Sequence, residues 1–144
     1  MANSHMYSEI KNALHSQITT WLANNDELID VYTVPYQNIA IFPAVTLELD
    51  RRRKPKIGVG VRELQLDMNI WVYTDILDTE DAEEECLRVC ELIEDAIESD
   101  KTLGGKVTYL SLDDEAEFGT VQNGEASFLQ GARLSLQIKK RFAK

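Results

Sequence analysis

The longest regular pattern of hydrophobic positions in the chain predicts a helix from about Thr79 to Ser99. Apolar residues recur there at three- and four-residue spacing, which places them on one stripe of a helix. The stripe consists of Ala82, Cys86, Val89, Cys90, Ile93, Ala96 and Ile97. Asp78 or Thr79 can cap the start of this helix. We predict that Gly104 and Gly105 end it, because glycine adopts the left-handed conformation of a C-terminal cap.

The opposite face of this helix is acidic, and Arg88 is its one basic residue. The acidic residues are Glu84, Glu85, Glu91, Glu94, Asp95 and Glu98. Such a run of charge is ordinarily a solvated helix face. The alternative is an electrostatic surface that either keeps nucleic acid away or receives a basic partner.

Weaker patterns predict one further helix and five strands. Apolar positions at helical spacing predict the helix from Tyr7 to about Ala23. Alternating or continuous apolar runs predict the strands. The strands are Leu28–Val34, Ile39–Asp50, Leu64–Tyr73, Lys106–Leu112 and Ala132–Lys139. Regular pairing of the second strand is expected to begin at Ala44. The turn formers from Pro35 to Asn38 separate the first two strands. The polar stretch from Asp113 to Ser127 is predicted to be a long loop.

The second and third strands are predicted to form a long hairpin, and its connection carries a cluster of basic residues. The cluster is Arg51, Arg52, Arg53, Lys54 and Lys56. A second basic cluster, near the end of the chain, is Lys139, Lys140, Arg141 and Lys144. Gly58 and Gly60 make the connection of the hairpin pliable.

The order of the elements predicts an α+β fold. Short connections favour antiparallel pairing, so we expect a single antiparallel or mixed β-sheet with a long β-hairpin, packed against two α-helices. Residues 7–144 are expected to form one domain. Residues 1–6 resemble an expression-vector leader and are excluded from this interpretation. We find no apolar run long enough for a membrane span and no signal peptide.

The net charge of the 144-residue chain is −10, which opposes binding of nucleic acid over the surface as a whole. The positive charges are nevertheless gathered in the two clusters. An acidic helix and separate basic patches are typical of a protein that associates with itself through unlike surfaces. The basic cluster of the hairpin contains no aromatic residue, which favours contact with protein, or a role in solubility alone, over binding of nucleic acid.

The sequence contains no recognisable catalytic constellation, and we predict no enzymatic activity, cofactor or metal. His15 lies off the apolar stripe of its helix and is predicted to be on the surface. Cys86 and Cys90 are predicted to be buried free thiols, because a zinc site would need two more ligands. Gly58 and Gly60 precede a strand, whereas a phosphate loop precedes a helix. The acidic run at residues 113–115 lacks the spacing of a calcium loop and is interpreted as solvated.

The order of several short segments along nearly the whole chain carries a family resemblance. The segments are Phe42-Pro43-Ala44-Val45-Thr46-Leu47, Ile70-Trp71-Val72-Tyr73, the long helix, Thr102-Leu103-Gly104-Gly105-Lys106-Val107, and Ala132-Arg133-Leu134-Ser135-Leu136. Their combination resembles the tail-terminator and minor tail proteins of long-tailed bacteriophages and prophages.

The resemblance implies an α+β subunit of a homohexameric ring in the virion tail, assembled in the cytoplasm of the bacterial host. Such a ring caps the tail tube, stops its polymerisation and provides the surface that joins the head. Its partners would be further copies of itself, the tail tube protein and a head-completion or neck protein. DNA would only pass through the lumen, and no cofactor, catalysis or membrane is implied.

A head-to-tail ring needs two unlike surfaces on each subunit. We therefore hypothesise a subunit interface between the basic cluster of the hairpin and the acidic helix face. Its residues would be Arg51, Arg52, Arg53, Lys54 and Lys56 on one side, and Glu84, Glu91, Glu94, Asp95 and Glu98 on the other. Two alternatives stay open. One is a head–tail connector of the neck, and the other is a small α+β regulator that binds a ligand or nucleic acid.

Overall fold

A computed structural model describes residues 6–27, 29–33, 44–74, 79–123 and 127–143. The helices are α1 (Met6–Asn24) and α2 (Thr79–Ser99), and the strands are β1 (Asp30–Tyr32), β2 (Ala44–Arg53), β3 (Lys56–Gly58), β4 (Val61–Thr74), β5 (Tyr109–Asn123) and β6 (Ser127–Ala143). Both predicted helices are confirmed, and the bounds of α2 agree with those expected from its periodicity.

The strands form one mixed sheet in the order β1-β2-β4-β6-β5, and the short β3 pairs with β4 beyond the end of β2. Only β1 and β2 run parallel; all other pairs are antiparallel. Strands β2 and β4 are the two arms of the predicted hairpin. The predicted fold class, an α+β protein with one sheet packed against two helices, is confirmed.

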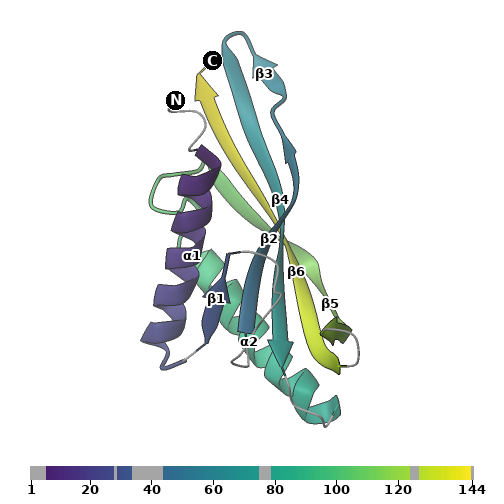
Figure 1. The fold of residues 1–144 in the computed structure, drawn as a ribbon. Coiled ribbons are helices and arrows are strands. Elements are labelled where there is room, and N and C mark those ends of the chain that lie inside the picture. Colours follow the sequence, from purple (N-terminus) through teal and green to yellow (C-terminus); the bar gives the residue numbers. More distant parts are fainter. Residues whose placement is uncertain (1–5, 28, 34–43, 75–78, 124–126, 144) are drawn as a thin grey trace.

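Both helices lie on the same face of the sheet (Figure 1). Helix α2 packs on β4, β6 and β5, while α1 packs on α2 and β1. The whole predicted stripe of α2 is buried, and so are the alternate residues that β4 and β6 direct towards the helices. The strand residues in this core include Leu64, Leu66, Met68, Ile70, Val72, Leu134, Leu136 and Ile138. The residues between them on β4 and β6 face away from the helices, so the sheet has one covered and one open face.

Hydrogen bonds from two polar side chains of α1 fix its position. The amide nitrogen of Gln17 donates to the carbonyl oxygens of Ala96 and Asp100, at 2.8 and 2.9 Å. The Nε2 atom of His15 lies 2.8 Å from the carbonyl oxygen of Val31 in β1. His15 is therefore half-buried, and the prediction of a surface histidine is wrong, because β1 packs along that side of α1.

The residues that follow the end of α2 do not cap it as predicted. The helix ends at Ser99, and the carboxylate of Asp100 accepts hydrogen bonds from the backbone N–H groups of Thr102 and Gly104, at 2.9 and 2.8 Å. Gly104 and Gly105 have φ angles of 69° and 88°. The glycines thus shape a turn beyond the helix and do not cap it.

The predicted loop from Asp113 to Ser127 is wrong. Strand β5 continues through Asn123, and β6 begins at Ser127. The register between β5 and β6 shifts between Leu112 and Ala116. This bulge interrupts the alternation that identifies a strand, and a strand at the edge of a sheet tolerates polar residues. Strand β5 also begins at Tyr109, three residues later than expected.

Strand β2 carries part of the basic cluster that was predicted to lie in the connection. Arg51, Arg52 and Arg53 pair with residues 65–67 of β4. The register of β2 shifts at Asp50. Leu49, just before the shift, pairs with the buried Met68 and is itself 38% exposed. The predicted turn at residues 35–38 and the first part of the second strand, residues 39–43, lie outside the described residues.

Truncation of Ile93 should test the packing of α2 on the sheet. The Ile93→Ala variant removes a fully buried side chain from the stripe, and we expect a loss of about 2–5 kcal/mol in the free energy of unfolding. Leu87→Ala, on the exposed side of the same helix, should change that energy by about 0.5 kcal/mol or less. Urea unfolding followed by tryptophan fluorescence measures both. Equal losses in the two variants would contradict the packing described here.

Candidate functional site

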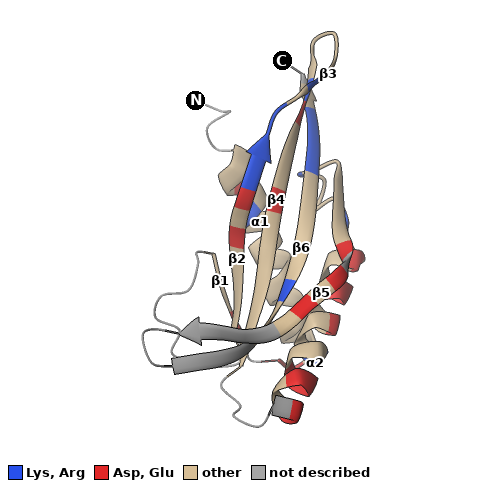
Figure 2. Cartoon of the chain, turned by 90° about the vertical axis from the view of Figure 1, so that its right-hand side faces the viewer, with Lys and Arg blue, Asp and Glu red and all other residues tan. Residues whose placement is uncertain are grey.

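The structure joins the two basic clusters of the sequence into one surface. Strands β2, β4 and β6 lie side by side, so Arg53 and Lys139 flank the same residue, Gln65, from opposite sides. We call this surface the basic end of the sheet. It consists of Arg51, Arg52, Arg53, Lys54, Lys56, Arg62, Lys139, Lys140 and Arg141. In Figure 2, ribbon segments coloured for Lys and Arg gather towards the end of the sheet that bears β3.

Several cations of the basic end are held by partners within the chain. Arg53 forms an ion pair with Asp67 at 3.4 Å, and Arg62 donates a hydrogen bond to the carbonyl oxygen of Lys54 at 3.1 Å. The ammonium group of Lys54 lies 5.9 Å from the centre of the Phe142 ring. Arg51, Arg52 and Lys56, by contrast, are exposed and form no ion pair with another described residue. Their charges are available to a partner.

The acidic face of α2 is exposed as predicted. Glu84, Glu91, Glu94, Asp95 and Glu98 are all exposed. Burial, and then the neighbouring carboxylates of Glu91, Asp95 and Glu98, raise the pKa of Glu94. The basic end and the acidic face lie in different regions of the molecule (Figure 2). One copy of the chain therefore does not bring the two predicted halves of the interface together.

A second acidic surface lies on β5. The sequence did not predict it as part of the sheet, because this stretch was expected to be a loop. Asp113, Glu115 and Glu117 are exposed on this outermost strand of the sheet. We call these three residues the acidic edge. Glu117 forms an ion pair with Arg133 of β6, whereas Asp113 and Glu115 pair with no described cation. Only the register of β5 on β6 reveals this surface.

The turn between β3 and β4 exposes an apolar tip. Ile57, Val59 and Val61 are 45%, 104% and 37% exposed. Gly60, with a φ angle of 71°, forms the turn there. This tip projects beyond both helices (Figure 1). Exposed apolar residues that lie together on a surface are typical of contacts with other proteins.

Cross-strand pairs between polar side chains cover the open face of the sheet. The carboxylate of Glu48 accepts hydrogen bonds from Asn69 and from the indole nitrogen of Trp71, at 3.3 and 3.2 Å. Arg133 lies 5.7 Å from the centre of the Trp71 ring, which stacks on Tyr73. These pairs hold neighbouring strands together on a face that no described helix covers.

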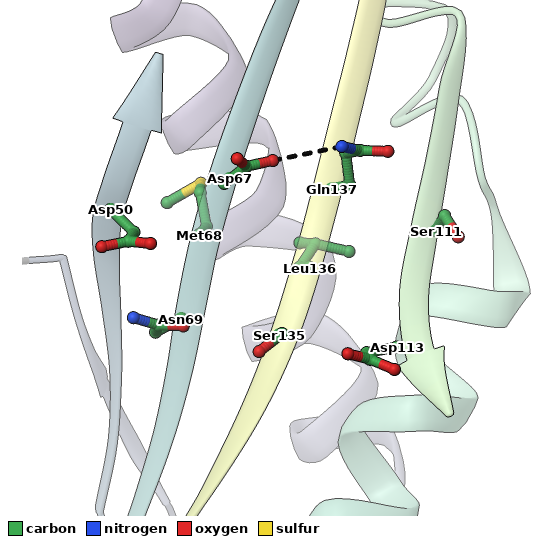
Figure 3. Close-up of a pocket in the computed structure, with 9 residues that line it drawn as sticks. All are labelled: Asp50, Asp67, Met68, Asn69, Ser111, Asp113, Ser135, Leu136 and Gln137. Carbon is green, nitrogen blue, oxygen red and sulfur yellow. Dashed lines mark hydrogen bonds between the residues drawn. The ribbon is translucent and has the colours of Figure 1, made fainter. Parts of the chain in front are cut away.

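A hollow of about 380 Å³ lies on the same face (Figure 3). Asp50, Asp67 and Asp113, from three different strands, lie around it, and Gln137 donates a hydrogen bond to Asp67 at 3.2 Å. Among the described residues, no group of three histidine, cysteine or carboxylate side chains is arranged to hold a metal ion. The hydroxyl groups of Ser111 and Ser135 also line the hollow.

The two thiols lie in the core and are unsuited to catalysis. Burial raises the pKa of Cys86 to about 11 and that of Cys90 to about 12. A nucleophilic cysteine needs a lowered pKa and access to solvent. The prediction that both are buried free thiols is confirmed.

Neither described helix has the length and hydropathy needed to cross a membrane.

Comparisons with known proteins do not identify a family: no family model and no curated protein matches this chain. The interpretation of the site therefore depends on the surfaces described above.

Glu63, at the basic end, should make stability depend on pH. Its side chain is buried, and the hydrogen bond from Gln65 at 2.7 Å, together with Arg141 at 3.4 Å, lowers its pKa despite the burial. A lowered pKa stabilises the folded state above the ordinary value of 4.5, and this stabilisation is lost as the pH falls through the folded-state pKa.

We expect the free energy of unfolding of the wild type to fall more steeply between about pH 6 and about pH 3 than that of Glu63→Gln. Glu83→Gln, which removes one exposed carboxylate, is the matched control. Urea unfolding at each pH measures the three curves. Parallel curves for the wild type and Glu63→Gln would contradict this role of Glu63.

Proposed function

We propose that this chain is a structural tail protein of a bacteriophage or prophage, a tail terminator that assembles into a hexameric ring on the tail tube. The observation that supports this most is the separation of charge on the folded chain. The basic end lies at one end of the sheet, and the acidic surfaces lie on α2 and on β5.

Unlike surfaces in separate regions favour head-to-tail contact between copies. Such contacts form a closed ring when the rotation between copies closes, and an open filament when it does not. A protein that stops the growth of a tube needs the closed arrangement, because a filament would continue to grow. The separated charges are therefore suited to the ring that the family resemblance implies.

The chemistry of the described residues also agrees with a structural role. The thiols are buried, and His15 contacts the backbone of β1. The exposed apolar tip at residues 57–61 offers a contact surface for a second protein, such as the tail tube protein or a head-completion protein.

In this role the ring would cap the tube, end its polymerisation and present the surface that joins the head. DNA would pass through the lumen without being read. The net charge of −10 suits such a passage, because a surface that repels phosphates lets DNA slide.

One observation favours a second candidate, a regulator that binds nucleic acid. The two basic clusters form a single surface, and Phe142 lies beside Lys54 within it. An aromatic ring among cations is a feature of surfaces that bind single strands.

Light scattering behind a sizing column, with negative-stain images, tests the proposal. We expect a particle of six times the chain mass of 16.4 kDa, seen as an annulus, whose population falls as salt is added. A monomer at every soluble concentration would contradict the ring. A monomer that also binds oligonucleotides with a steep salt dependence would support the regulator.

A further inference from the structure

The sheet has two edges along which no described strand pairs. Strand β1 pairs with residues 44–46 of β2, so the rest of β2, from Leu47 to Arg53, has no described strand on that side. At the opposite side of the sheet, β5 is the last strand along its whole length. Backbone N–H and C=O groups on such edges are free to pair with another strand.

The directions of the strands make these two edges compatible. Strands β2, β4, β6 and β5 alternate in direction, because each neighbouring pair is antiparallel. With four strands in this alternation, β2 and β5 run in opposite directions. A second copy placed beside the first in the same orientation therefore brings its β2 against β5 of the first as an antiparallel pair. Strand direction then alternates across each contact between copies, as it does within one copy.

The charges on the two edges differ in sign. The free part of β2 carries Glu48 and Asp50 as well as three arginines, which gives it a net charge of +1, whereas β5 carries four acidic residues and no cation. Arg51 and Arg52 are exposed and form no ion pair with a described residue. The edge formed by β5 carries Asp113 and Glu115, which are likewise unpaired. Pairing β2 with β2, or β5 with β5, would bring like charges together, whereas pairing β2 with β5 joins opposite charges.

Exposed apolar side chains also lie on both edge strands. Leu49 on β2 is 38% exposed, and Tyr109 and Phe118 on β5 are 46% and 41% exposed. An edge that serves only to prevent aggregation is ordinarily short, charged and poor in exposed apolar residues. These strands combine charge with apolar surface, which is the composition of a specific interface.

We propose that copies of this chain associate by β-strand addition, the free edge of β2 in one copy pairing antiparallel with β5 in the next. The occupant of each edge is a second copy of the same chain. This proposal deepens the proposed function and rests on it, since it names the contact that would join neighbouring subunits of the ring. In this proposal the arginines of β2 contact the acidic edge of the next copy, and no longer the acidic face of α2 that the sequence suggested.

The pairing includes a stagger between copies. Within one chain, Arg51 is level with Asp67 of β4, whereas the bulge that contains Asp113 and Glu115 lies between the levels of Met68 and Ile70. These two acids of one copy therefore face Arg51 and Arg52 of the next when the copies shift along the strands. Closed sheets contain such a shift, because their strands tilt relative to the axis of closure.

Charge reversal in three double variants tests the proposal. Arg51→Glu/Arg52→Glu makes both edges acidic. Asp113→Arg/Glu115→Arg changes the net charge of β5 from −4 to 0 and sets two cations against Arg51 and Arg52 of the next copy. Glu84→Lys/Glu91→Lys on α2 is the matched control, because it changes the net charge as much as the second variant does. Circular dichroism checks that each variant is folded, and light scattering at low salt measures its mass.

We expect the wild type and the α2 variant to assemble, and each edge variant alone to remain monomeric. An equimolar mixture of the two edge variants should assemble again. In an alternating ring the introduced glutamates of one variant then face the introduced arginines of the other, and the native arginines face the native carboxylates. Recovery in the mixture cannot result from misfolded chains.

Three results would overturn the proposal. Edge variants that assemble as the wild type does would exclude strand pairing and leave the ring itself standing. Loss of assembly in the α2 variant, with assembly retained in the edge variants, would assign the contact to the acidic face of α2. A wild type that stays monomeric at low salt would contradict both this proposal and the proposed function.

Discussion

The packing of α2 against β4 and β6 is the interaction on which the rest of the structure depends. The stripe of α2 and the alternate residues of the two strands together form most of the buried core. Helix α1 adds a second layer to the same face, where Gln17 binds the end of α2. Because all of this apolar surface lies on one side of the sheet, the other side and the edges are left for polar groups and for contact with other molecules.

This one-sided arrangement determines where charge can gather. On the open face, side chains pair across neighbouring strands, as Glu48 does with Asn69 and Trp71. The edges lack a strand to pair with on one side, and the cations of β2 and the anions of β5 accumulate there. A self-associating protein can use both edges at once, because each copy offers one edge of each kind. The fold thus separates the surfaces by its topology as well as by its sequence.

Much of the fold could be predicted from the sequence, because the patterns involved are local. The stripe of α2, the alternation of β4 and the burial of Cys86 and Cys90 each depend on spacing within one element. The failures have non-local causes. The bulge after Leu112 interrupts the alternation of β5, so the sequence predicts a loop there. His15 is half-buried because β1 packs against it, and the sequence of α1 does not show that contact.

The candidate site was less predictable for the same reason. The acidic face of α2 follows from helical spacing alone, and its exposure is confirmed. The single basic end depends on the register that sets Arg53 and Lys139 on either side of β4, and composition contains no information about register. The acidic edge depends on β5 being a strand at all.

Amide hydrogen exchange, compared above and below the concentration at which the chain assembles, tests the central claim most directly. If strands of neighbouring copies pair, the outward-facing amides of residues 47–53 and 109–123 should exchange more slowly in the assembled state, while exchange in α2 stays the same. Unchanged exchange along both strands on assembly, with new protection elsewhere, would contradict the account.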